Sequence, residues 1–206
     1  MSQTSFEKSL DSDWQFILTD ILPPQGNWTE EEYLVLTEHR QRLVEFTDGF
    51  LEILPIPTEQ HQLLLKFLFL VFFNHLERAG GIVMFAPLRL QIRPGKYREP
   101  DLMLLQTIQD PRRENRFWTG ADLVLEVVSE DKRDRDLIEK KEAYAEAGIP
   151  EYWIVNPLNE SVTVLRLQSG SYLKFGVYHR GENALSALHP GFFFSVESLF
   201  DAGKVP

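Results

Sequence analysis

The order of apolar and polar residues along the chain predicts a mixed succession of helices and strands. A short helix is expected from Thr29, where a capping threonine precedes three glutamates. Residues 43–46 and 50–54 form the strands of a predicted hairpin, joined by a turn that contains Asp-Gly. Residues 57–78 form a long helix that is apolar on nearly every side, so we expect it to be buried.

The middle of the chain contains a strand, a helix and a second strand in succession. The strands are expected at residues 121–128 and 152–155, with the helix between them at 135–147. Such a crossover unit normally makes its two strands parallel within one sheet. Further strands are predicted at residues 82–92, 100–105, 162–167, 173–178 and 192–196. We therefore expect an α/β or α+β fold, with an N-terminal arm at residues 1–28 and a single domain at 29–206.

The amino-acid composition excludes several classes of catalytic and structural site. The 206 residues include no cysteine, which excludes disulfide scaffolds, thiolate zinc sites, iron–sulfur clusters and thiol catalysis. The longest apolar run, residues 63–73, is interrupted by Lys66 and is far shorter than the ~20 residues that a bilayer needs, so we expect no membrane association. The first residues lack the pattern of a secretory signal, and a cytoplasmic location is expected.

The charge balance does not by itself favour a nucleic-acid partner. The formal net charge is −10, and a charge of that sign repels phosphate backbones. Between residues 89 and 141, 12 basic residues balance 11 acidic ones, so the excess of acid lies elsewhere in the chain. Charge alone therefore favours a solvated surface of mixed sign.

Two acidic residues stand out because their neighbours are apolar. Asp101 follows Pro100 and precedes Leu-Met-Leu-Leu, and Glu126 lies within Leu-Val-Leu-Glu-Val-Val. A buried carboxylate is costly unless a cation or hydrogen bonds compensate it. If the two strands are neighbours, both carboxylates can face one point and hold Mg²⁺, which can activate water and stabilise charge on a phosphodiester. The alternative is that Glu126 faces solvent from a half-exposed strand and Asp101 caps a turn.

Lys140 is a third candidate, on the helix that follows Glu126. It lies four residues before Tyr144, so both can share one helix face, where the amine could position water or stabilise transition-state charge. The alternatives are a surface lysine paired with Asp136, or the same role taken by Lys141. His61, in the first turn of the long helix, could approach the site, although capping or core packing is favoured. The sequence holds no phosphate-binding glycine loop, nucleophile elbow or dinucleotide fingerprint.

Three segments resemble a known family. REPDLMLL, ADLVLEVVSEDKRDRD and LIEKKEAYAEAGIPEYWIVNP are similar to the Uma-type family of putative restriction endonucleases, within the PD-(D/E)XK nuclease superfamily. The resemblance implies a nuclease core of a mixed sheet flanked by helices, with Asp101 and Glu126 as the metal-binding catalytic acids. Two residues after Glu126 stands Val128 instead of the superfamily's lysine, and the resemblance implies that Lys140 supplies the missing amine.

The leading hypothesis is an endonuclease that depends on Mg²⁺ or Mn²⁺, hydrolyses DNA and forms a homodimer to address both strands. The rival is a catalytically silent nuclease fold that binds nucleic acid or protein, favoured by Val128 and the acidic net charge. A third hypothesis, an unrelated acid–base hydrolase that uses Asp101 and Glu126, has no supporting sugar-binding pattern.

Overall fold

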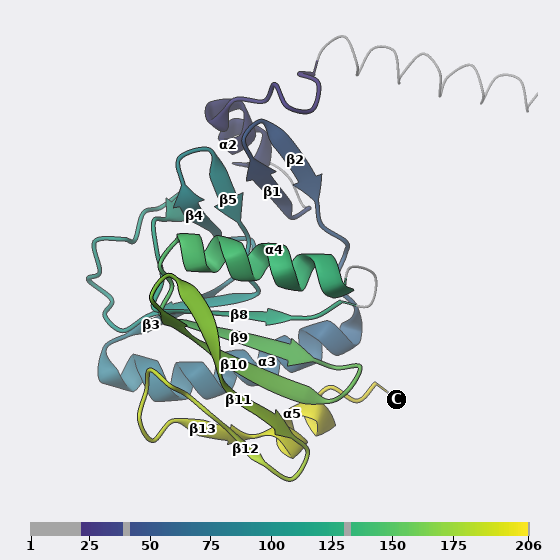
Figure 1. The fold of residues 1–206 in the computed structure, drawn as a ribbon, viewed down its shortest axis with the longest axis vertical. Helices are drawn as coiled ribbons and strands as arrows, with labels where there is room; N and C mark the ends of the chain where they lie inside the picture. The colour runs from purple at the N-terminus through teal and green to yellow at the C-terminus, as the bar shows by residue number, and fades with distance from the viewer. Residues whose placement is uncertain (1–21, 39–41, 130–132, 206) are drawn as a thin grey trace, which may run out of the picture.

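The computed structural model describes residues 22–38, 42–129 and 133–205 (Figure 1). Most of the expected N-terminal arm, residues 1–21, lies outside the described residues. The helices are α2 Glu30–Glu38, α3 Glu59–Leu76 with the 3₁₀ turn η1 Glu77–Ala79, α4 Arg133–Glu146 and α5 Val196–Ala202. The strands are β1 Val44–Thr47, β2 Phe50–Ile53, β3 Ile82–Phe85, β4 Arg89–Arg93, β5 Lys96–Arg98, β6 Leu102–Leu105, β7 Phe117–Trp118, β8 Leu123–Val127, β9 Glu151–Asn156, β10 Ser161–Gln168, β11 Ser171–His179, β12 Asn183–Leu185 and β13 Phe193–Ser195.

A six-stranded mixed sheet forms the centre of the molecule, in the order β11-β10-β9-β8-β6-β3. β8 and β9 are parallel and are joined through α4, which confirms the crossover predicted from the sequence. The other neighbouring strands of this sheet are antiparallel. Figure 1 shows α4 across one face of the sheet, with α3 and α5 on the opposite side. The expected mixed sheet flanked by helices is confirmed.

Alternation along the strands divides the core between these two faces. Leu102 and Leu104 of β6 belong to the cluster that includes the buried residues of α3 and α5. Met103 and Leu105 belong to the cluster beneath Tyr144 of α4. Because successive side chains of a strand point to opposite faces, this division also decides which helix any polar residue of these strands will meet.

Helix α3 differs from the sequence prediction. Its buried residues follow one stripe, Leu64, Leu68, Phe72 and Leu76, spaced four residues apart and packed on the sheet. The opposite side is open, and Leu70 is 49% exposed. The prediction that this helix is buried all round is therefore wrong for the isolated chain, because the described residues place a sheet against one side of it only.

A second sheet lies beyond α4, in the order β2-β1-β5-β4-β7. The predicted hairpin is confirmed, and its turn residues Asp48 and Gly49 have φ angles of 47° and 90°, as a two-residue hairpin turn requires. The strand predicted at residues 82–92 is divided, with β3 in the central sheet and β4 in the second. Pro87 lies in the break and has no amide hydrogen to continue a ladder.

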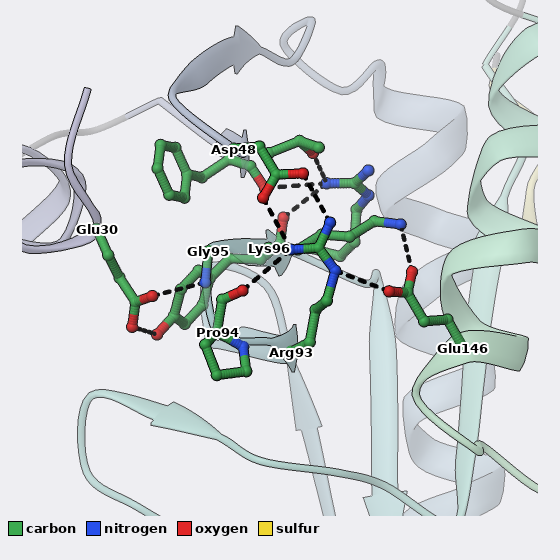
Figure 2. Close-up of polar contacts among 11 residues, drawn as sticks. Glu30, Asp48, Arg93, Pro94, Gly95, Lys96 and Glu146 are labelled. Atoms are coloured by element: carbon green, nitrogen blue, oxygen red, sulfur yellow. Dashed lines mark hydrogen bonds and ion pairs between the residues drawn. The ribbon is translucent and has the colours of Figure 1, made fainter. Parts of the chain in front are cut away.

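Polar contacts tie the second sheet to the end of α4 (Figure 2). Arg93 at the end of β4 makes two hydrogen bonds of 2.8 and 2.7 Å to the carboxylate of Asp48 in the hairpin turn. Its Nε donates to Glu146 of α4 at 2.8 Å, and Lys96 of β5 donates to the same carboxylate at 2.7 Å. These contacts hold the polar face of the second sheet against the helix that carries Lys140.

Candidate active site

The two acids singled out in the sequence lie on neighbouring strands. β6 and β8 pair antiparallel with Leu102 opposite Leu125, which places Asp101, just before β6, beside Glu126. Asp101 alternates with Met103, and Glu126 alternates with Val124, so both carboxylates belong to the face covered by α4. Asp101 is 9% exposed and Glu126 is 5% exposed. The condition set by the sequence, that the two strands be neighbours, is met.

Hydrogen bonds fix the carboxylate of Asp101. Its Oδ2 accepts the backbone N–H of Val127 at 2.7 Å, across the β6–β8 pair. The same oxygen lies 3.2 Å from Nε2 of His61, in the first turn of α3. Burial disfavours the charged His61 ring, but the Asp101 carboxylate, helped by Glu126, outweighs burial and raises the pKa of His61. The sequence favoured capping or core packing for His61, and the structure instead places its ring against Asp101.

The carboxylate of Glu126 is held by two residues of α4. Lys140 Nζ donates to Oε2 at 2.8 Å, and the Tyr144 hydroxyl donates to Oε1. Burial raises the pKa of Glu126 to about 7, with Asp101 adding to the rise and Lys140 opposing it. Burial also opposes the charge on Lys140, but the carboxylates of Glu126, Glu45 and Asp101 outweigh it and raise the pKa of Lys140 above its ordinary value. Lys140 is therefore a protonated cation, and the spacing of four that joins it to Tyr144 explains why both meet one carboxylate.

Two buried polar atoms near the carboxylates have no hydrogen-bond partner among the described residues. They are Nδ1 of His61 and the hydroxyl of Tyr152. Tyr152 is fully buried on β9, and the negative charges of Glu126 and Asp101 act on it. Unpaired polar groups are rare in a protein interior, and these two are among six such atoms in the described part of the chain.

Charged residues of the second sheet also lie near the site, and the sequence analysis did not identify them. Glu45 of β1 is 4% exposed and pairs with Arg98 of β5 at 3.3 Å. Glu99 is also buried and accepts the amide of Val44 at 2.8 Å. Burial, with the charge of Glu45, raises the pKa of Glu99 to about 8. An acid between apolar neighbours, as in Val44-Glu45-Phe46, is the same signal that identified Glu126, and it could have identified Glu45.

A cleft of 560 Å³ lies between the polar face of the second sheet and α4. Glu45, Lys96 and Arg98 line the sheet side, and Glu139 and Glu142 line the helix side. Glu45 also acts electrostatically on Lys140, so the cleft adjoins the catalytic candidates. The volume lies within the range of small-molecule pockets.

Comparisons with known proteins identify the family of this chain and a solved structure of similar fold. The family model described as "Uma2: Putative restriction endonuclease" matches residues 30–197. This chain belongs to the Uma2 family. A crystal structure from Anabaena variabilis, described as a putative nuclease belonging to DUF820, is similar with a TM-score of 0.71 and 18% sequence identity. The match covers 86% of this chain and 99% of that one. No curated protein matches the sequence.

In this Uma2 member, Val128 stands at the position where the resemblance noted in the sequence led us to expect a lysine. Val128 is buried, and its amide donates to Val155 at 2.8 Å, so the position belongs to the sheet. The amine next to Glu126 comes instead from Lys140, whose Nζ donates to that carboxylate, and its catalytic role stays a prediction. The alternative pairing of Lys140 with Asp136 is not described, because the Asp136 side chain lies outside the described part of the structure.

The donor atoms suit a hard divalent cation that completes its coordination with water or substrate. Within residues 22–38, 42–129 and 133–205, no group of three or more His, Asp or Glu side chains is arranged to hold a metal. Mg²⁺ is commonly held by one or two carboxylates, with waters and substrate phosphates as its other ligands, and Asp101 and Glu126 meet that requirement. The negative charge of Asp101 adds to the effect of burial in raising the pKa of Glu126, and a cation between the two carboxylates would oppose that rise. Restriction endonucleases generally use a divalent metal.

Among the helices of the described segments, none is both long enough and apolar enough to cross a bilayer.

Proposed function

We propose that this protein is a nuclease that hydrolyses phosphodiester bonds in DNA and depends on Mg²⁺ or Mn²⁺. The observation that carries the proposal is the convergence of Asp101 and Glu126 from neighbouring strands, with Lys140 bonded to Glu126 at 2.8 Å. Membership of the Uma2 family of putative restriction endonucleases supports the same reaction class. A location in the cytoplasm stays a prediction.

Asp101 and Glu126 are the residues that would hold the metal ion. When bound, such an ion lowers the pKa of water and neutralises developing charge on a phosphoryl oxygen. The carboxylates must be ionised to bind it, so the pKa of about 7 for Glu126 makes metal binding favourable above neutral pH. The Val127 amide and the His61 ring hold the carboxylate of Asp101 in place through its Oδ2.

Lys140 is proposed to stabilise negative charge on the phosphate during attack. Its pKa is raised, so it remains protonated and cannot accept the proton of the attacking water. A buried ammonium fixed by a carboxylate is a preorganised charge, which costs little reorganisation when the transition state forms. Tyr144 holds the other oxygen of Glu126 and fixes that carboxylate in place.

Cleavage of supercoiled plasmid with Mg²⁺ or Mn²⁺ tests the proposal, together with Glu126→Gln and Asp101→Asn. Both variants should lose at least 100-fold in cleavage rate, and calorimetry with Mn²⁺ should show a site in the wild type that is lost in both. Glu197→Gln, an exposed acid on α5, is the matched control and should keep full activity. Full cleavage by Glu126→Gln would refute the assignment.

A second function, a catalytically silent module that binds nucleic acid or protein, has specific support. Both oxygens of Glu126 already have partners, and four acidic residues against two basic ones line the adjoining cleft, a balance of charge that disfavours phosphate. This function predicts no cleavage with any divalent metal and binding of a partner that does not depend on metal. Electrophoretic mobility shifts with DNA and RNA, with and without Mn²⁺, separate the two functions.

A further inference from the structure

Glu45 on β1 is a buried acid to which the proposed reaction gives no role. Its neighbours Val44 and Phe46 belong to the apolar core of the second sheet, so the Glu45 side chain points to the other face, which lines the cleft beside α4. Only 4% of the residue is exposed. An ionised carboxylate in such a place is costly unless cations and hydrogen bonds compensate it. The contacts of Glu45 therefore indicate what it does.

The carboxylate of Glu45 is held only by long contacts within its own sheet and the residue after it. Nε of Arg98 lies 3.3 Å from Oε2, and the Glu99 amide donates to Oε1 at 3.3 Å. Both distances exceed the range of about 2.7–3.2 Å that is usual for an N–H···O hydrogen bond. Arg98 also donates through Nη1 to three other oxygens of the second sheet. Because a carboxylate offers about four acceptor sites, Glu45 has room for a further donor.

Lys140 of α4 lies between this carboxylate and the catalytic candidates. It shares a helix face with Tyr144, which donates to Glu126, and the residue before it on α4 lines the cleft together with Glu45. Within the described residues its ammonium forms one ion pair, with Glu126 at 2.8 Å. The charge of Glu45 nevertheless acts on Lys140 more strongly than the charge of Asp101 does. Glu45 is therefore the second acid in the surroundings of this ammonium.

The present position of the ammonium conflicts with a divalent cation at Glu126. The two Glu126 oxygens accept from Lys140 and Tyr144. The Tyr144 hydroxyl is neutral, but an ammonium and a divalent cation on one carboxylate repel each other at such short range. The lysine stem is flexible, and the ammonium has three donors, of which one is used here. Lys96 and Glu146 meanwhile hold the second sheet against α4, so Glu45 stays close by (Figure 2).

We propose that Glu45 is a second acceptor for the Lys140 ammonium, and that it receives the ammonium once the Glu126 carboxylate is engaged by a divalent cation. In the metal-free protein the ammonium neutralises Glu126 in place of that cation. Glu45 is then a positioning residue, because it keeps the displaced ammonium buried beside the site. The exchange on metal binding rests on the proposed function, whereas the acceptor role of Glu45 rests on the contacts of this chain alone.

The Glu126→Gln variant tests the acceptor role without any metal. Burial already raises the pKa of Glu126 to about 7, so an uncharged side chain should be tolerated at this position. Scalar coupling across the hydrogen bond, measured by NMR between Lys140 Nζ and a carboxyl carbon, identifies the acid that holds the ammonium. We expect coupling to Glu126 in the metal-free wild type and coupling to Glu45 in the variant. Wild type saturated with Mg²⁺ should also show coupling to Glu45.

Calorimetry with Mn²⁺ tests what the acceptor contributes to metal binding. Glu45→Gln leaves the displaced ammonium buried without a carboxylate, so the Mn²⁺ dissociation constant should rise at least about tenfold. Glu142→Gln is the matched control, because Glu142 lines the same cleft from α4 but is exposed, and the same loss of charge there should change the constant less than about threefold. Thermal melting checks that both variants fold.

Each outcome decides the inference. Coupling to Glu45 in Glu126→Gln, with weaker Mn²⁺ binding in Glu45→Gln alone, supports it. Coupling in Glu126→Gln to another acid, or to none, overturns it, as does equal weakening of Mn²⁺ binding by Glu142→Gln. Should Glu45→Gln fail to fold, the wild type with Mg²⁺ decides, and coupling that stays on Glu126 overturns the inference. A wild type that binds no metal counts against the proposed function, and the metal-free coupling then decides the acceptor role.

Discussion

The Tyr144 hydroxyl is one of the groups that oppose the effect of burial on the pKa of Glu126, and Tyr144→Phe removes this hydroxyl with little change in side-chain shape. In the wild type the hydroxyl donates to Oε1, and this bond is one of the interactions that lower the pKa of Glu126 against the effect of burial. The variant leaves Lys140 on the other oxygen. We expect the pKa of Glu126 to rise, and metal binding at neutral pH to weaken because a proton competes for the carboxylate.

The size of the effect follows from the hydrogen bond. A hydrogen bond to a charged group contributes about 1.5–3 kcal/mol, and one pKa unit corresponds to about 1.4 kcal/mol, so the pKa should rise by about one to two units. With a wild-type pKa of about 7, half of the Glu126 carboxyls are ionised at pH 7. A rise of one unit leaves about a tenth ionised, which weakens metal binding about fivefold at that pH.

The same shift changes how stability depends on pH. The folded-state pKa of Glu126 lies above the ordinary value, so its protonated form stabilises the fold at low pH, and that contribution is lost as the pH rises through about 7. In Tyr144→Phe this loss of stability should extend to a pH about one unit higher. Urea unfolding of the metal-free protein between pH 4 and 9 measures this directly.

Calorimetric titration with Mn²⁺ between pH 6 and 9.5 is the deciding assay. The variant should bind about fivefold more weakly at pH 7 and recover wild-type affinity at pH 9.5, where both carboxylates are ionised. Tyr172→Phe is the matched control, because Tyr172 is buried and donates to the Ile149 carbonyl at 2.7 Å, away from the acids. A Tyr144→Phe profile that overlays the wild type, or weak binding that high pH does not restore, would refute this account of Glu126.

Three further results are expected. Lys140→Met should lower the cleavage rate at least 100-fold, whereas Lys141→Met, at the exposed neighbouring position, should leave it unchanged. Leu68→Ala should lower the free energy of unfolding by about 3 kcal/mol in urea, because Leu68 is fully buried, while Leu173→Ala at an exposed position should change it little. Glu146→Gln should speed amide exchange in the turn between β4 and β5 while changing the unfolding free energy by less than about 1 kcal/mol, since that carboxylate is half exposed and its pairs are screened.

Several features of the site follow from the amino-acid sequence alone. The strand–helix–strand pattern predicted the parallel pair β8–β9, and the isolated acid in Leu-Val-Leu-Glu-Val-Val identified Glu126. The shared helix face of Lys140 and Tyr144 follows from their spacing of four. These features are local, and periods of two and 3.6 residues determine them without reference to the rest of the chain.

Tertiary structure decided which of these local features meet. The pairing of β6 with β8, the arrival of His61 at Asp101, and the approach of Glu45 from a separate sheet all join residues far apart in the sequence. A local pattern shows that a strand has a buried face, but many partners could bury it, and competition among all the elements selects one. For the same reason the sequence showed that α3 is apolar on nearly every side, while only the folded chain showed which side lacks a partner.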